Sequence, residues 1–283
     1  MSAPAAGPVY DLHSHSTVSD GVLRPADVAA RAHRNGVQVW ALTDHDETGG
    51  LAEAAEAASV LGMDFVPGVE ISVTWAGRTV HVVGLNIDPG HVELNAGLAS
   101  TRACRAERAQ RMGQRLAELG LPGCYEGALP YADNPELVSR THFARYMVDS
   151  GLCPDLRSVF NRYLADGMPA DVPIRWASLE DCVTWILAAG GVAVLAHPGR
   201  YKYSELEFDA LYGVFRDLGG SAIEVIAGGH TPEQYVEYAH IARYYGFLAS
   251  TGSDFHSPTE SRVDLGQLPP LPPMLTPVWT AWS

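Results

Sequence analysis

The sequence predicts an α/β fold in which a parallel sheet or barrel is interrupted by an α-helical insertion. Short apolar runs rich in β-branched residues alternate with Ala-rich amphipathic stretches in both halves of the chain, the pattern of βα units. Between about Asn95 and Ala177 this strand signal fades and helical patterns replace it. We therefore expect a discontinuous barrel domain, residues 1–95 and 178–283, around an insertion at residues 96–177.

The predicted barrel elements follow one another as strand, then helix. An opening strand leads into Asp11, and the amphipathic stretches Pro25–Asn35 and Gly50–Leu61 are expected helices. Further buried strands are expected at Val37–Thr43, Phe65–Ser72, Val80–Leu85, Val192–Ala196, Ala222–Ile226 and Phe247–Thr251.

The insertion is predicted to be helical at Gly97–Leu119, Thr141–Ser150 and Asp155–Leu164. Pro, Gly and Asn cluster at Leu121–Pro135, which indicates a loop between these helices. The proline-rich tail Gln267–Pro277 is expected to wrap the surface without a catalytic role.

Composition excludes several classes of protein. No apolar run approaches the roughly 20 residues that span a bilayer. The segment Met1 to Tyr10 lacks a basic stretch followed by an apolar one, so we expect a cytoplasmic protein. A formal net charge of −14 argues against binding to duplex nucleic acid, which relies on many Lys and Arg side chains. An anionic substrate must therefore be held by local cations.

The four cysteines are spaced widely along the chain. None forms a C-x-x-C pair. We interpret them as thiols rather than zinc ligands or disulfides: Cys104, Cys124, Cys153 and Cys182.

Histidines and carboxylates recur at or beside the predicted strand ends. The opening strand continues as Asp11-Leu-His13-Ser-His15, in which the two imidazoles project to the same side of an extended chain. The later strands carry similar groups, in the stretches Leu42-Thr-Asp44-His45-Asp46, Pro67-Gly-Val-Glu70, Val80-His81, Ala196-His197-Pro198 and Ser253-Asp254-Phe-His256. A single histidine on an apolar strand is usually a satisfied core residue, but this many together indicate a site.

These groups are expected to meet at one mouth, because the carboxyl ends of parallel barrel strands converge there. So many nitrogen and oxygen ligands exceed the needs of one divalent ion and suit two or three, such as Mn, Zn or Fe. The candidate metal ligands are His13, His15, Asp20, His45, Glu70, His81, His197, Asp254 and His256.

In order, these motifs resemble those of the polymerase and histidinol phosphatase (PHP) superfamily: H-x-H, T-D-H, a Glu after P-G-V, H-P and S-D-x-H. The resemblance covers roughly residues 10–95 and 178–260. It implies a distorted (β/α)7 barrel, a TIM-like fold, with a centre of two or three metals, of which Mn is preferred. It also implies the following ligand sets: His13, His15, Glu70 and Asp254 for one metal; Asp20, His45 and His256 for a second; Glu70, His81 and His197 for a third.

Within the superfamily, the helical insertion and the stretches Asp133–Arg145 and His197-Pro-Gly-Arg-Tyr201 are similar to those of the bacterial 3′,5′-nucleoside bisphosphate phosphatases. This resemblance implies removal of the 3′-phosphate from a nucleoside bisphosphate, with a 5′-mononucleotide such as AMP and phosphate as products. It implies that the substrate contacts Ser139, Arg140, Thr141 and His142.

Two arginines are candidate phosphate ligands, Arg140 and Arg200, because a guanidinium binds phosphate in a bidentate manner. Ser139 is also a plausible N-cap for the helix that follows, and helix N-termini themselves attract phosphate. Two histidines are candidates for the acid that protonates the leaving sugar oxygen, and we favour His142 over His256, which is a predicted metal ligand.

Four other functions remain open. The same site would accept short 5′-phosphorylated RNA or DNA and trim it as a 5′-to-3′ exonuclease. Histidinol phosphate ranks below nucleotides as a substrate. An amidohydrolase acting on C–N bonds often uses a carbamylated lysine as its bridging ligand, whereas the only lysine here, Lys202, lies outside the strand ends. A non-catalytic, metal-dependent nucleotide-binding module would be expected to lack ligands, and none is missing.

Overall fold

One sheet curls into a nearly closed barrel in the computed structural model, which describes residues 7–282. The first and last strands meet, since Leu12 N donates to Thr251 O at 3.0 Å and Ser14 pairs with Phe255. The distorted barrel predicted from the sequence is confirmed. The short strand β5 (Ala177–Ser178) pairs with β3 outside the main order, which is β1 (Tyr10–Asp11), β2 (Val39–Leu42), β3 (Asp64–Trp75), β4 (Arg78–Leu85), β6 (Val192–Leu195), β7 (Ala222–Ala227) and β8 (Leu248–Gly252).

The strand β4 departs from the predicted parallel arrangement, because it runs antiparallel to both β3 and β6. A tight turn at Ala76 and Gly77, with φ of 45° and 75°, joins β3 to β4 as a hairpin. The start of β4, not its end, therefore lies at the mouth of the barrel. This reversal places His81 opposite Ser72 of β3.

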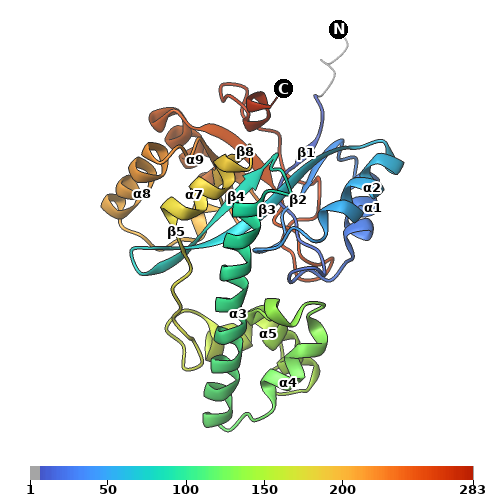
Figure 1. Ribbon diagram of the computed structural model, residues 1–283, viewed down its shortest axis with the longest axis vertical. Coiled ribbons are helices and arrows are strands. Elements are labelled where there is room, and N and C mark those ends of the chain that lie inside the picture. The colour runs from blue at the N-terminus through green and yellow to red at the C-terminus, as the bar shows by residue number, and fades with distance from the viewer. Residues whose placement is uncertain (1–6, 283) are drawn as a thin grey trace.

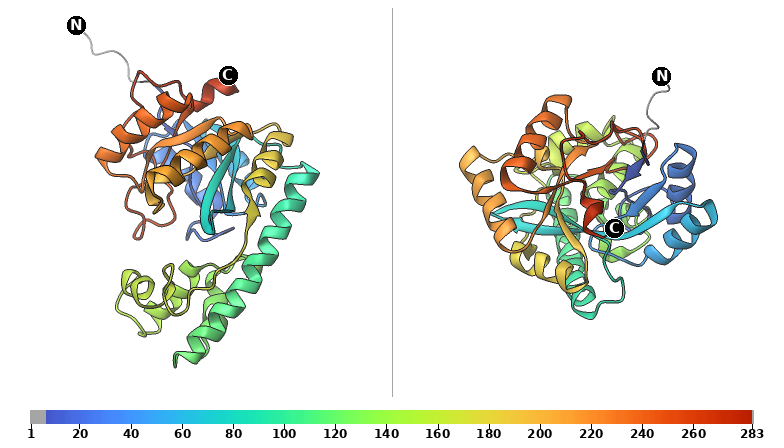
Figure 2. Two further views of the ribbon diagram at one scale, coloured as in Figure 1. Left: turned by 90° about the vertical axis from the view of Figure 1, so that its left-hand side faces the viewer. Right: turned by 90° about the horizontal axis from the view of Figure 1, so that it is seen from above.

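Helices cover the outside of the barrel, as Figures 1 and 2 show. They are α1 (Pro25–Arg34), α2 (Leu51–Leu61), α7 (Leu179–Ala188), α8 (Glu205–Asp217) and α9 (Pro232–Tyr245). Local sequence sets their ends: α9 begins with Thr231 and Gln234 in a capping box around Pro232 and ends at Gly246, whose φ is 75°.

The long helix α3 (Val92–Glu118) leads from the barrel into a separate helical unit (Figure 1). Its first turns pack on α7, where Gly97 lies so close to Trp185 that a Cβ would come within 2.5 Å of the indole. Its last turns join a second hydrophobic cluster that includes Met112 and Phe143. The helix begins earlier than predicted, so the expected boundary at residue 96 falls inside it.

The helical unit also contains α4 (Cys124–Ala128), α5 (Arg140–Asp149) and α6 (Leu156–Val159), the last continued by a π-helical turn at Phe160–Leu164. The chain returns to the barrel along the β3–β4 hairpin. There Trp176 donates from its backbone N to Thr74 Oγ1 at 2.8 Å and from Nε1 to Thr79 Oγ1 at 3.0 Å.

The C-terminal tail lies over the end of the barrel (Figure 2). Ala249 N donates to Thr276 O, Val278 is fully buried, and Trp279 stacks on Tyr10 with ring centroids 3.7 Å apart. No helix within residues 7–282 is both long and apolar enough to cross a membrane. Most of the segment Met1 to Tyr10 lies outside the described residues.

Candidate metal centre

Two histidines and two carboxylates form the innermost group of the site. His13 Nε2 and His15 Nε2 lie 3.2 Å apart. Both face Glu70 Oε2, at 3.3 and 3.2 Å, and Asp254 Oδ1, at 3.5 and 3.2 Å. Ligands about 2.1 Å from a tetrahedral ion are about 3.4 Å apart, so these four atoms have the spacing of one coordination shell.

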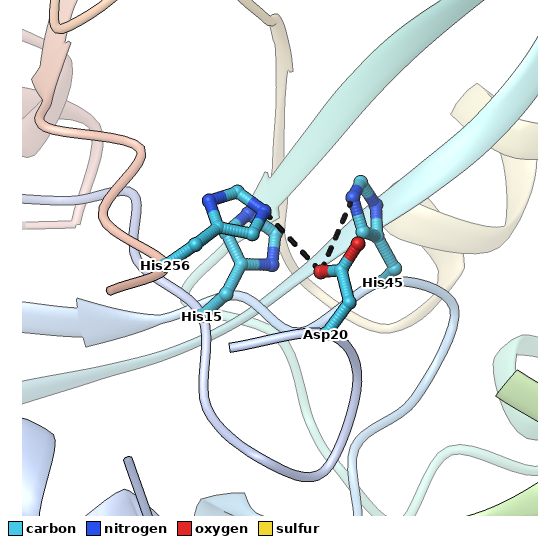
Figure 3. A group of neighbouring side chains, drawn as sticks. All are labelled: His15, Asp20, His45 and His256. Atoms are coloured by element: carbon cyan, nitrogen blue, oxygen red, sulfur yellow. Dashed lines mark ion pairs between the residues drawn. The ribbon is translucent and has the colours of Figure 1, made fainter. Parts of the chain in front are cut away.

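A second group consists of His15, Asp20, His45 and His256 and is shown in Figure 3. Asp20 Oδ1 lies 3.2 Å from His256 Nε2 and 3.9 Å from His45 Nε2. All four residues offer a ligand atom within 4.8 Å of the others. The structure thus brings Asp20, His45 and His256 together as predicted and adds His15, which the prediction had placed only in the first group.

A third group is centred on the other side of Glu70. His45 Nδ1 lies 2.9 Å from Glu70 Oε2, and His81 Nδ1 lies 2.9 Å from Glu70 Oε1. His197 Nε2 also lies 2.9 Å from Glu70 Oε1. His45, Glu70 and His81 offer mutually close ligand atoms, and His197, the predicted third ligand of this group, lies beside the same Glu70 oxygen as His81.

Several buried polar atoms of the cluster lack hydrogen bonds, as fits a site for bound cations. Among the residues that the structure describes, several buried side-chain atoms here make no hydrogen bond of good geometry: Asp20 Oδ1, His45 Nδ1, Glu70 Oε2, His81 Nδ1 and His197 Nδ1. A buried polar atom left unsatisfied in this way costs stability. Imidazole and carboxylate donors suit Mn, Zn or Fe rather than soft ions.

The electrostatics of the cluster differ between its inner and outer imidazoles. Against the effect of burial, the carboxylates of Glu224, Glu70 and Asp254 raise the pKa of His13, and hydrogen bonds to Asp254 and Glu70 raise the pKa of His15 to about 9. Burial alone would raise the pKa of Glu70, but the imidazoles of His45, His81 and His13 hold it well below its usual range. Burial lowers the pKa of both His45 and His197 to about 4. Anionic carboxylates and neutral imidazoles are the forms that bind cations.

A carboxylate behind the cluster, Glu224, was missed by the sequence analysis. Glu224 Oε1 lies 2.8 Å from His13 Nδ1, and Oε2 accepts from His197 N at 2.6 Å. It thereby fixes which nitrogen of His13 faces the site, as carboxylates behind metal-binding histidines do. The signal was present, since Glu224 is the one charged residue in the buried strand β7, with the sequence AIEVIA.

A second supporting carboxylate is Asp44. It accepts hydrogen bonds from Ser16 N at 2.8 Å, Ser16 Oγ at 2.6 Å and Ser19 Oγ at 2.6 Å. Ser19 Oγ in turn lies 3.4 Å from His15 Nδ1. Asp44 thus holds the loop that carries His15.

Two of the candidate ligands have unusual backbone conformations. His197 has a φ of 27° and Asp254 a φ of 54°, both in the left-handed region that disfavours residues with a Cβ. Each follows a strand, β6 and β8 respectively, and turns back over the mouth of the barrel. Strain of this kind persists where the surrounding structure holds it and is common in functional sites.

The helical unit approaches the cluster through the start of α5. Ser139 caps α5 and donates from Oγ to Asp20 Oδ2 at 3.1 Å. Arg140 pairs with the exposed Asp166, Nη1 to Oδ1, at 2.7 Å. Ser139, Arg140 and Thr141 line a cavity of about 200 Å³ together with residues of the histidine and carboxylate cluster.

His142 differs from its three neighbours, because it is fully buried and does not line this cavity. Its Nδ1 accepts from Ser139 N at 3.0 Å and completes the capping box of α5. Burial lowers its pKa to about 4, so the imidazole is neutral at neutral pH. The geometry therefore favours a structural role over the predicted role of proton donor.

Arg200 lies against the cluster itself. Its Nη2 is 2.5 Å from Asp254 Oδ2, and it lines the cavity. The pairing raises the pKa of Arg200, and the same charge helps hold the pKa of Asp254 well below its usual range. Lys202, by contrast, is exposed and belongs to none of the three groups, so no lysine bridges this site.

Comparison with known proteins agrees with this geometry. The PHP domain family profile matches residues 11–101. A 3′,5′-nucleoside bisphosphate phosphatase of Chromobacterium violaceum is 51% identical, covering 95% of this chain and 94% of the relative. A 5′-3′ exoribonuclease of Haemophilus influenzae is 41% identical, covering 95% and 97%.

Two solved structures share the fold along nearly the whole chain. One, from Chromobacterium violaceum, is described as an amidohydrolase with bound sulfate and no metal; it has a TM-score of 0.93 and 50% identity, covering 96% of this chain and 95% of that chain. The other, from Bifidobacterium adolescentis, is assigned as a metal-dependent phosphoesterase; it has a TM-score of 0.81 and 28% identity, covering 98% and 94%.

Proposed function

Because the chain belongs to the PHP domain family, we propose that it is a metal-dependent phosphatase that removes the 3′-phosphate of nucleoside 3′,5′-bisphosphates. The products are a 5′-mononucleotide, such as AMP, and phosphate. The observation that carries the proposal is Glu70, a buried carboxylate that faces two separate groups of imidazoles in a cavity whose other wall is lined by arginines. The relative from Chromobacterium violaceum supports the choice of substrate.

The proposed cofactor is two or three divalent ions, with Mn preferred, held by the nine predicted ligands. When bound, such ions supply a nucleophile from water at neutral pH and stabilise the charge on the phosphoryl oxygens. Glu224 orients the imidazole of His13 directly, and Asp44 orients that of His15 through Ser19. Arg200 donates to the phosphoryl group that is cleaved, since it already lies against Asp254.

The helical insertion, residues 96–177, contributes the wall that faces the remainder of the substrate. Ser139 and Arg140 act there as substrate-binding residues, and Ser139 also ties this wall to Asp20 of the barrel. A cytoplasmic location is part of the proposal. The four cysteines, which were interpreted as thiols, are all free, as suits a reducing compartment.

The test is hydrolysis of three substrates by the Mn-loaded protein: adenosine 3′,5′-bisphosphate, a 5′-phosphorylated dinucleotide and histidinol phosphate. Phosphate release measures the first and third reactions, and release of 5′-mononucleotides measures cleavage of the dinucleotide. We expect rapid release from the bisphosphate with AMP as the other product, and none from metal-stripped protein. Faster cleavage of the dinucleotide would identify an exonuclease instead. Histidinol phosphate as the best substrate would contradict both.

The exonuclease is the second candidate, and a particular cavity favours it. A neighbouring cavity of about 460 Å³ shares Thr79, Arg108 and Arg200 with the catalytic one and has room for a further nucleotide. The relative from Haemophilus influenzae is a 5′-3′ exoribonuclease. The same P–O3′ bond would break in both reactions, so one metal centre would serve either substrate.

A further inference from the structure

Three arginines from the helical unit line the catalytic cavity: Arg105 and Arg108 of α3 and Arg140 of α5. They differ in how many carboxylates and other acceptors each guanidinium contacts. Arg105 is buried and fully engaged, with Nε 2.5 Å from Asp46 Oδ2 and Nη2 2.6 Å from Ser72 Oγ. Arg105 is therefore a structural cation.

Arg108 is held in place but poorly paired. Its Nε donates to Val172 O at 3.2 Å, and its guanidinium lies over the Trp176 ring, 5.6 Å from the centroid. The nearest carboxylate oxygen, Asp171 Oδ1, is 3.7 Å from Nη2, too far for a hydrogen bond. Across residues 7–282, Val172 O is the only acceptor for this guanidinium, so both Nη groups remain available.

Two other cations are close to Arg108. Burial, followed by the neighbouring charges of Arg140 and Arg105, lowers its pKa to about 9. Arg140 Nη1 pairs with Asp166, whose side chain is 91% exposed, and makes a long hydrogen bond to Leu164 O at 3.4 Å. An exposed ion pair of this kind is easily exchanged for another anion. This wall therefore has the charge and the free donors to bind a dianion.

The position of Arg108 separates it from the reacting phosphate. Arg200 lies against Asp254 in the metal-binding cluster, whereas the charged neighbours of Arg108 all belong to the helical unit. Both arginines line the same cavity. A substrate with two phosphate groups would place one at each end.

We propose that Arg108, assisted by Arg140, binds the phosphate that is not cleaved, and that Arg108 is the residue that selects bisphosphates over monophosphates. This inference rests on the proposed function, since it names the recognition element for the same substrate. It assigns the 5′-phosphate to the helical wall of the cavity, formed by Arg105, Arg108 and Arg140, and the 3′-phosphate to the barrel wall, formed by the histidine and carboxylate cluster with Arg200.

The test compares two substrates that carry the same scissile group, adenosine 3′,5′-bisphosphate and adenosine 3′-monophosphate, on the Mn-loaded full chain. In Arg108→Met the ratio of their kcat/KM values is expected to fall about 10- to 100-fold, the factor that losing a hydrogen bond to a charged group produces. Most of the change lies in the KM for the bisphosphate. An unchanged ratio would overturn the proposal.

Three variants make the result specific. Arg111→Met removes a charge one turn further along α3, where Arg111 is exposed and faces Glu107, and leaves the ratio unchanged. Asp166→Asn removes the competing carboxylate and raises the ratio. Arg108→Lys retains the charge and is expected to give a ratio between those of wild type and Arg108→Met. If Arg108→Met lowers the thermal stability of the protein, the ratio measured for Arg108→Lys is the test: a wild-type ratio would contradict the proposal.

Binding of AMP and of adenosine, measured by calorimetry on the same proteins, separates this proposal from the proposed function. If the wild-type protein releases no phosphate from the bisphosphate, the proposed function fails. Arg108→Met is still expected to weaken AMP binding about 10-fold or more relative to adenosine. Equal weakening of both ligands would show that Arg108 binds no phosphate.

Discussion

The two walls of the catalytic cavity are built differently. The barrel wall holds mutually close histidines and carboxylates, most of them buried, with further buried groups such as Glu224 behind them. The helical wall holds, beside the buried and engaged Arg105, two arginines whose partners are few or exposed: Arg108 and Arg140. Under the proposed function this difference is a division of labour: the barrel wall is organised in advance for the chemistry, and the helical wall keeps free donors for recognition.

The largest effect is expected on the barrel wall from Glu70→Gln. The change preserves volume but removes the charge that faces His13, His15, His45 and His81. Turnover is expected to fall roughly 10³-fold or more, and bound metal to fall with it. Metal content by mass spectrometry, alongside phosphate release, checks this. Full activity with a full complement of metal would refute the role of Glu70.

A smaller loss is expected from Glu224→Gln, because Glu224 acts through His13 and the backbone of His197. Changes behind a metal ligand typically cost about 10- to 100-fold in metal affinity or activity. Activity titrated against Mn measures this loss. Glu237→Gln, on the exposed surface of α9, is the control and is expected to behave as wild type.

On the helical side of the cavity, His142→Gln is expected to change stability rather than turnover. Glutamine at this position of a capping box still accepts from Ser139 N. The pKa of His142 is about 4 in the folded state, against about 6.5 unfolded. The unfolded chain therefore takes up the proton first, and stability from this group, present above about pH 6.5, is lost as pH falls toward 4.

Between pH 7.5 and pH 5, the wild-type protein is thus expected to lose about 2 kcal/mol more stability than His142→Gln. Urea unfolding at the two pH values measures the difference. Turnover of the variant is expected to stay within about threefold of wild type at every pH. Loss of the alkaline limb of the wild-type pH–rate profile in the variant would instead identify His142 as the proton donor.

The smallest effect is expected from Ser139→Ala. It removes the N-cap of α5 and the hydrogen bond to Asp20 Oδ2, and the loss of such a cap costs about 1 kcal/mol. Denaturant unfolding measures the change. Ser139→Asp is an informative companion, because it retains a capping group but places a second carboxylate beside Asp20 and is expected to lower activity.

Much of the barrel wall could be predicted because its signals are local. The candidate ligands lie within a few residues of apolar runs, as His197 does after Val192–Leu195. Because strand ends converge at the mouth of a barrel, these residues were expected to lie close together. The reversal of β4 was missed, although Ala76 and Gly77 between two β-rich runs are a hairpin signal. His81 nevertheless reaches the predicted site, since an antiparallel strand brings its start to the same edge.

The helical wall was harder to predict because its geometry depends on distant contacts. Arg108 looks like any arginine on an amphipathic helix, and only the returning chain at Val172 and Trp176 fixes it beside the cavity. His142 was assigned to the substrate from its motif, whereas its rotamer turns it back into the cap of α5. Sequence patterns identify residue types, but the direction of a side chain is set by packing.

The most direct test of this division of labour is a crystal structure of the Mn-loaded protein with AMP and phosphate bound. The account predicts inorganic phosphate against the cluster around Glu70 and Asp254, and the AMP phosphate against Arg108 and Arg140. An AMP phosphate bound at the metal cluster, with the arginine wall facing only solvent, would contradict it.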